Sequence, residues 1–275
     1  MDIAGEIEQV WADALDAAAG PSLWSVVVFA PARGVSAVVR DESVYNAGEL
    51  IHGFIAQVVE RAVAAGALDW NTAVLVTPQH VEGTRGVLAA GLVPVRLPLH
   101  TVVALMLTTG DAGAAAALVD VCGGVVAVND TLARAGYERS RVCLSGGVAD
   151  PRADQWQADP HLPSHAAAAV TCARDVFGML RDCAASPVIG PMLAAHQHGC
   201  GLARTGGAMQ HIAAATSGVR HDVGVAELSG EPGDVCYTLV LTDGRDRPDT
   251  PDDAVWLAMA DAHAAAQAAL LAARD

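Results

Sequence analysis

Residues 24–40 read WSVVVFAPARGVSAVVR. Two runs rich in β-branched residues, 24–30 and 34–40, flank a Pro-Ala-Arg-Gly turn, and this pattern predicts a β-hairpin. From residue 46 to 65 the apolar residues recur at helical spacing, which predicts an amphipathic helix that ends near Gly66. A hairpin followed by a long helix indicates that strands and helices are mixed along the chain.

The rest of the chain continues this mixture of short apolar runs and helical periodicity. Further strands are expected at residues 72–77, 92–97, 117–121, 125–128, 141–145, 223–228 and 235–241. Further helices are expected at residues 81–90, 100–107, 166–184, 211–216 and 252–273. The order repeats in the two halves, so we expect an α/β protein with partly parallel sheets and two lobes, 1–110 and 111–275, around a cleft.

Composition limits the possible partners and the compartment. The 275 residues carry a formal charge of -15, and a surface this acidic repels phosphates, which disfavours nucleic acid as a partner. The sequence has no uninterrupted apolar run of about 18 residues, so no membrane span is expected. The amino terminus lacks a basic segment and an apolar signal core, and the cysteines form no CxxC pair. We therefore expect a cytoplasmic protein with reduced cysteines.

The chain contains no lysine, so all 16 of its basic residues are arginine. This absence excludes a phosphate-binding P-loop lysine, a Schiff base with a carbonyl substrate and any lysine general base. The exclusion is chemical and holds whatever the reason for the composition.

Several segments together resemble the actin-like ATPase superfamily, in particular the nucleotide-binding domain of the seventy-kilodalton heat-shock chaperones. Residues 72–78 and 85–96 resemble a strand ending in proline, a helix that carries an arginine, and an Ala-Gly-Leu turn into the next strand. Residues 120–124 (Asp-Val-Cys-Gly-Gly) resemble the second phosphate loop, and residues 204–210 the turn that contacts adenosine. Residues 250–258 resemble the Pro-Asp-Glu-Ala-Val segment that opens a late helix in these chaperones.

The resemblance implies a duplicated ribonuclease-H-like fold, as in actin-type ATPases, with ATP or ADP and magnesium between the lobes. Asp120 is then the expected catalytic acid. The residues expected to contact the nucleotide are Arg33, Gly34, Gly123, Gly124, Gly206 and Gly207.

The sequence also departs from that family. The first phosphate loop of the family carries an aspartate, whereas the corresponding turn at residues 29–34 has no acid and contains a proline. The catalytic lysine of the family is missing as well. We therefore expect a degenerate chaperone-type relative that binds adenine nucleotide weakly or not at all, is at most a weak ATPase, and acts through a protein partner.

An alternative interpretation rests on histidines, six of which lie between residues 161 and 221. His196, His198 and Cys200 alternate along the chain, so an extended segment would place them on one side in a geometry that zinc accepts. A zinc-bound water would make the protein a hydrolase. A serine nucleophile at Ser145 or Ser164 is disfavoured because no G-x-S-x-G elbow is present. A third possibility is a structural partner protein with neither site.

Overall fold

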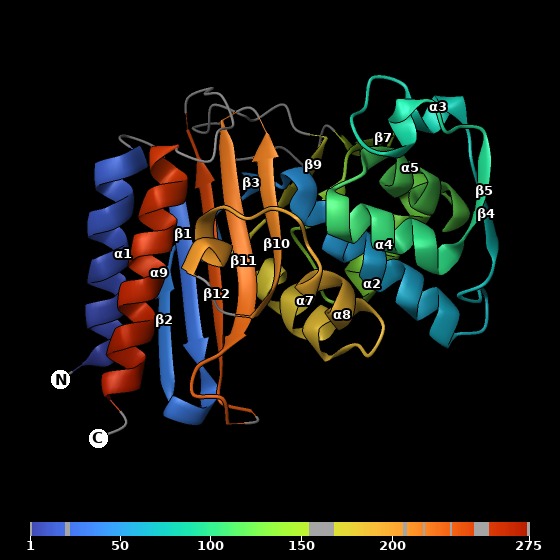
Figure 1. The fold of residues 1–275 in the computed structure, drawn as a ribbon. Helices are drawn as coiled ribbons and strands as arrows, with labels where there is room; N and C mark the ends of the chain where they lie inside the picture. Colours follow the sequence, from blue (N-terminus) through green and yellow to red (C-terminus); the bar gives the residue numbers. More distant parts are fainter. Residues whose placement is uncertain are drawn as a thin grey trace.

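A five-stranded sheet stands between two helical layers in the computed structural model (Figure 1). The described residues are 2–19, 23–153, 168–205, 208–216, 218–231, 233–244 and 253–273. The strand order is β10-β11-β12-β1-β2, and every neighbouring pair is antiparallel. The strands are β1 (Leu23–Ala30), β2 (Val35–Val39), β10 (Met209–Thr216), β11 (Val219–Glu227) and β12 (Val235–Asp243).

Two long helices from the ends of the chain, α1 (Ile3–Ala19) and α9 (Ala254–Ala272), lie side by side on one face of the sheet (Figure 1). The helices on the other side are α2 (Ile51–Ala64), α3 (Pro78–Val81), α4 (Leu99–Thr109), α5 (Ala112–Val121), α6 (Gly124–Arg134), α7 (Ala173–Ala185) and α8 (Ile189–Ala194). The 3-10 turns are η1 (Pro31–Arg33), η2 (Gly48–Leu50), η3 (Leu88–Ala90) and η5 (Gly201–Thr205).

Short strands complete the helical part. A small sheet contains β3 (Tyr45–Asn46), β9 (Ala169–Thr171) and β6 (Arg141–Val142), and two hairpins pair β4 (Ala73–Val76) with β5 (Val95–Pro98) and β7 (Leu144–Ser145) with β8 (Val148–Ala149).

The main sheet has a hydrophobic core on each face. On β1, Val26 and Val28 pack towards α1 and α9, whereas Val27 packs towards the helical part. Their partners on β12 follow the same alternation, since Val26 pairs with Val240 and Val27 pairs with Leu239. Burial on both faces explains why these strands read in the sequence as continuous apolar runs.

Helix α9 is long and apolar enough, by length and composition alone, to cross a membrane. In this fold it is a core helix, because Trp256 and Met259 are fully buried against α1 and the sheet. Trp11 of α1 is buried in the same cluster. The packing of α1 on α9 therefore ties the first and last helices of the described chain together.

Several sequence predictions are confirmed. Residues 24–40 form the β1–β2 hairpin, and the predicted helix at 46–65 is η2 followed by α2. The predicted strands at 223–228 and 235–241 are β11 and β12, and the predicted terminal helix is α9.

The predicted duplicated ribonuclease-H-like fold of actin-type ATPases is wrong. Residues 117–121 and 125–128, predicted as strands of a second repeat, belong to helices α5 and α6, and the predicted helix at 211–216 is strand β10. The expected parallel pairing is also wrong, since every described strand pair is antiparallel. Helix α5 is buried along nearly its whole length, so its Ala- and Val-rich sequence has no polar face that would reveal a helical period.

Replacing Trp256 with alanine should destabilise the protein by about 3–5 kcal/mol, because the cavity would lie where α9 meets α1 and the sheet. Leu271→Ala on the same helix is the control, since Leu271 is exposed and should change stability by less than about 0.5 kcal/mol. Denaturant unfolding monitored by circular dichroism measures both. Equal effects of the two substitutions would contradict the assignment of α9 as a core helix.

Candidate functional site

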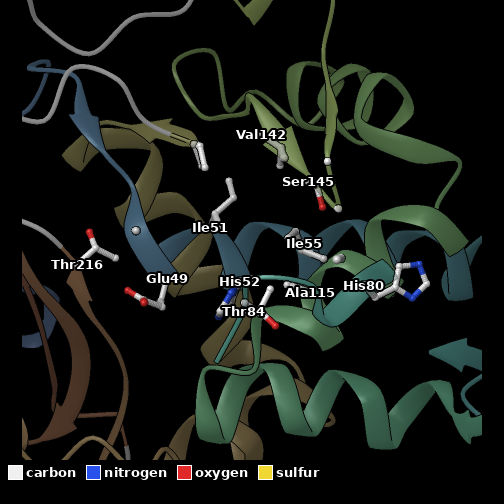
Figure 2. Close-up of a pocket in the computed structure, with 18 of the residues that line it drawn as sticks. Glu49, Ile51, His52, Ile55, His80, Thr84, Ala115, Val142, Ser145 and Thr216 are labelled. Carbon is white, nitrogen blue, oxygen red and sulfur yellow. The ribbon is translucent and has the colours of Figure 1, made fainter. Parts of the chain in front are cut away.

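A cleft of about 500 Å³ opens where the start of α2 meets the end of strand β10 and the amino-terminal end of α5 (Figure 2). Its apolar surface includes Ile51 and Ile55 of α2, Ala115 of α5 and Val142 of β6. Polar side chains stand around this surface, and they include Asn46, Glu49, Thr84, Ser145 and Thr216. The cleft combines an apolar wall with a few polar groups, which is the usual composition of a small-molecule site.

The helix that enters the cleft begins at a glycine held close to β10. Gly48 has a φ of +50°, a conformation that side chains other than glycine rarely adopt. A Cβ at this position would lie 3.1 Å from the Cβ of Ala214 and 3.6 Å from atoms of Thr216. Ile51, one helical turn later, also lines the cleft and is nearly buried. Backbone strain and the neighbouring strand therefore both oppose a side chain at position 48.

Backbone N–H groups at this junction already have acceptors from the protein. The N–H of Gly48 donates to Oδ1 of Asn46 at 3.1 Å. On the edge strand β10, the N–H of Ala215 donates to Oε2 of Glu49 at 3.1 Å. The N–H of Ala213, two residues earlier on the same edge, donates to Nε2 of His196 at 3.3 Å. These side chains cover an edge that would otherwise present unpaired N–H groups.

A smaller cavity of about 280 Å³ lies beside the cleft, and Glu49 lines both. His196 lines the smaller cavity, and its Nδ1–H donates to the carbonyl oxygen of Leu107 at 2.6 Å. Because its Nε2 accepts from Ala213, the imidazole is neutral in this arrangement. Burial lowers the pKa of His196 from 6.5 to about 4. His196 is thus a link between α4 and β10.

A buried carboxylate fixes the turn between α4 and α5, next to the cleft. Asp111 is fully buried and accepts hydrogen bonds from the N–H groups of Ala114 at 3.0 Å and Leu88 at 2.9 Å. It therefore caps the amino terminus of α5. The residues on either side, Gly110 and Ala112, are small, and each lines one of the two cavities.

Asp120, the expected catalytic acid, is an exposed residue of α5 that holds a histidine at the edge of the cleft. His80 lines the cleft, and its Nδ1 accepts from the N–H of Thr77 at 3.1 Å. The proton must then lie on Nε2, which donates to Asp120 at 3.0 Å. Both ring nitrogens are engaged, so the pair positions α3 against α5.

The other residues expected at a nucleotide site are spread over the fold. Arg33 and Gly34 form the β1–β2 turn, where Arg33 pairs with Asp234 at 2.6 Å. Gly123 and Gly124 join α5 to α6 with φ values of +94° and +87°. The β1–β2 hairpin and α5 lie on opposite sides of the molecule in Figure 1. The remaining pair, Gly206 and Gly207, lies outside the described residues.

The three side chains of the predicted zinc site make other contacts in this structure. Both ring nitrogens of His196 are hydrogen-bonded to backbone groups. The ring of His198 packs on that of Trp256, with the ring centroids 5.1 Å apart. Cys200 packs against the core beneath α9. Within the described ranges, no group of three or more His, Cys, Asp or Glu side chains could hold a metal ion. His161 and His165 fall outside those ranges.

A family model described as Beta-lactamase2, the beta-lactamase enzyme family, matches residues 6–265. A beta-lactamase from Sphaerobacter thermophilus is 21% identical, with 97% of each chain covered and a TM-score of 0.75. A beta-lactamase from Xanthomonas campestris is 14% identical, with 95% of this chain and 97% of the other covered and a TM-score of 0.76. The protein PBP-A is 15% identical, with 96% of each chain covered and a TM-score of 0.73. No curated protein sequence matches the chain.

These similarities overturn the resemblance to actin-like and heat-shock ATPases, and with it the expected chaperone-type role. The fold is that of beta-lactamases and penicillin-binding proteins, whose sheet and helical parts correspond to those in Figure 1. The matching family is one of hydrolases. Of the alternative interpretation as a zinc hydrolase, it therefore supports only the hydrolase class and not the zinc. Sequence reasoning missed Gly48, Glu49 and Ile51, because none of them forms a motif for nucleophilic catalysis.

The pKa of His196 generates a pH prediction. Because the folded-state pKa, about 4, lies below the ordinary value of 6.5, protons bind first to the unfolded chain as the pH falls. Stability should therefore be lost between pH 6.5 and about 4, and the contribution of His196 should level off below that range. His196→Gln should show a shallower loss over the same window in denaturant unfolding. An NMR titration that finds the ring charged near pH 6 would contradict the neutral link between α4 and β10.

Proposed function

Because this chain belongs to the beta-lactamase enzyme family, we propose that it binds a small molecule in the family cleft without forming an acyl-enzyme intermediate. The family is one of hydrolases, and the serine enzymes of class A act through a covalent intermediate on a serine nucleophile. The residues around the cleft of this chain support non-covalent binding instead.

The motifs of class A beta-lactamases and penicillin-binding proteins are S-x-x-K, S-D-N and K-T-G. Two of them contain lysine, which this chain lacks entirely, and the triplet S-D-N occurs nowhere in the sequence. The lysine that activates or orients the nucleophile therefore has no counterpart in the chain.

The spacing of these motifs can still be followed around the cleft. On a helix, a serine and a lysine three residues apart would face the same cavity. Gly48 and Ile51 have this spacing, and both line the cleft. Asp111 matches the acid of an S-D-N triplet. Its neighbours, Gly110 and Ala112, have no polar side chains. The cleft thus retains its walls, with small or apolar residues in place of reactive ones.

Stabilisation of a developing oxyanion is also disfavoured. Acyl transfer usually relies on two N–H donors aimed at the position where negative charge develops. At this junction the N–H of Gly48 already donates to Asn46, and that of Ala215 donates to Glu49. A carboxylate beside the reaction centre would in addition repel the oxyanion.

One observation carries the proposal: the first turn of the helix in the cleft begins with a glycine whose Cβ position is already crowded by Ala214. Covalent chemistry at this point would need a side chain there. Non-covalent binding needs only the cleft itself.

Incubation of the purified protein with a penicillin should give no mass adduct, and a chromogenic cephalosporin should not be hydrolysed above the buffer rate. An active class A beta-lactamase run in parallel is the positive control. Intact-protein mass spectrometry and absorbance follow the two reactions. An acyl adduct on any serine, Ser145 included, or steady turnover without an adduct would overturn the proposal.

Restoring the motif residues should not restore acylation. The double variant Gly48→Ser/Ile51→Lys should remain unlabelled by a fluorescent penicillin and should lose about 1–3 kcal/mol of stability, because the new Cβ crowds Ala214 at a φ of +50°. Adding Ala214→Gly removes the closest contact and should recover part of that loss. Rapid labelling of the double variant would show that the junction is open to a nucleophile.

A further inference from the structure

We propose that a second pocket, at the carboxyl-terminal ends of α2 and α5, binds a medium-chain carboxylate with its alkyl chain between the helices and its head group on Arg61. The pocket has a volume of about 320 Å³. The cleft lies at the opposite ends of the same two helices, and none of its described lining residues lines the second pocket. The proposal is therefore independent of what the cleft binds and of whether acylation occurs there.

The second pocket lies at the corner where α6 leaves α5. Helix α5 ends at Val121, α6 begins at Gly124, and the two helices form a bend of 82°. The last turns of α2 pack against both helices. At the corner, α2 and the loop after it contribute the small side chains of Ala62 and Ala67. Because these methyl groups are short, the corner between the three helices stays open.

The walls of the second pocket are mostly apolar. Val58 of α2 and Val121 of α5 line it, together with Leu68 from the loop that follows α2. Cys122 also lines it, and burial raises the pKa of this thiol to about 11, so the sulfur carries no charge at neutral pH. The volume lies at the lower end of the range of roughly 300–1,000 Å³ that is typical of small-molecule sites. A short alkyl chain can therefore be buried between the helices.

Arg61 supplies a positive charge at this apolar wall, and no acidic side chain is among the described residues that line the pocket. Its guanidinium lies 3.9 Å from Oδ2 of Asp182, which is beyond hydrogen-bond distance, and donates to no other group within the described ranges. Asp182 has closer partners, since its oxygens accept from the hydroxyl of Tyr137 and from Arg181, each at 3.0 Å. The side chain of Arg61 is 46% exposed, so a ligand can reach it. A guanidinium matches the two oxygens of a carboxylate.

A second guanidinium stands beside the pocket. Nη2 of Arg134, at the end of α6, donates to Oγ1 of Thr131 at 3.0 Å, and Thr131 lines the pocket. Arg134 is exposed and pairs with no acidic side chain in the part of the chain that the structure describes. Acidic residues on the three helices instead have partners of their own: Glu60 accepts from Ser186, Asp120 from His80 and Asp130 from Arg152. The local charge therefore favours a single negative head group although the whole protein is acidic.

The test compares octanoate, octanol and octylammonium by isothermal titration calorimetry with the full chain at neutral pH. The three ligands share an eight-carbon chain and differ in the charge of the head group. Octanoate should bind most tightly, roughly fivefold more tightly than octanol, because only the carboxylate pairs with the half-exposed guanidinium. Octylammonium should bind most weakly, because its charge is repelled by Arg61. Octanoate that binds no more tightly than octanol, or that does not bind at all, overturns the proposal.

Three charge variants locate the head group. Arg61→Gln should weaken octanoate by roughly fivefold and leave octanol unchanged, whereas Arg134→Gln, at the more distant guanidinium, should weaken octanoate by only about twofold. Arg96→Gln makes the same change in net charge at an exposed position of β5 that does not line the pocket, and it should have no effect. Equal losses in Arg61→Gln and Arg96→Gln would contradict the contact with Arg61, because only the net charge of the protein would then matter.

Two further measurements locate the alkyl chain. Ala62→Leu exchanges two good helix formers but fills the corner, so it should abolish the binding of octanoate and octanol alike while thermal unfolding confirms that the chain is folded. In the unmodified protein, octanoate should slow the alkylation of Cys122 by N-ethylmaleimide, measured by peptide mass spectrometry, and should not slow that of Cys200, which does not line the pocket. Undiminished binding in Ala62→Leu, or an unchanged rate at Cys122, would place the ligand elsewhere and overturn the proposal.

Discussion

The turn η2, which leads into α2, lies so close to strand β10 that a glycine at position 48 is the only residue that fits without strain. The same contact brings Glu49 to the N–H of Ala215, so the helix and the edge of the sheet are joined by a charge-assisted hydrogen bond. His196 makes a second link to the same edge through Ala213. The cleft therefore has a fixed end, at which side chains of the protein already accept the hydrogen bonds of these backbone N–H groups.

The position of β10 depends in turn on the sheet, which draws strands from both ends of the chain. Strand β1 pairs with β12 along most of its length, and α1 and α9 cover the outer face. On the inner face, α7 packs over the same strands and α2 packs against α7, while Asp111 fixes the turn that leads into α5. The walls of the cleft are thus held by two cores and a buried cap.

The sequence allows prediction of the elements that have a clear period or a clear turn, such as the hairpin at residues 24–40 and helix α2. It fails where burial removes the period, as in α5, whose sequence Ala-Gly-Ala-Ala-Ala-Ala-Leu-Val-Asp-Val is buried almost throughout. The candidate site could not be predicted from motifs, because a chain without lysine lacks two of the three that identify the family. Gly48 matters through its close approach to Ala214, a contact between residues distant in sequence.

Amide hydrogen exchange at Ala215, followed by NMR, tests most directly whether this junction is closed. If Glu49 occupies the edge of β10, the amide of Ala215 exchanges slowly in the native chain, and Glu49→Ala accelerates that exchange while residues paired within the β10–β11 ladder stay protected. Exchange of Ala215 at the rate of an unstructured peptide in the native protein would contradict the account, because the N–H would then be available to a ligand oxygen.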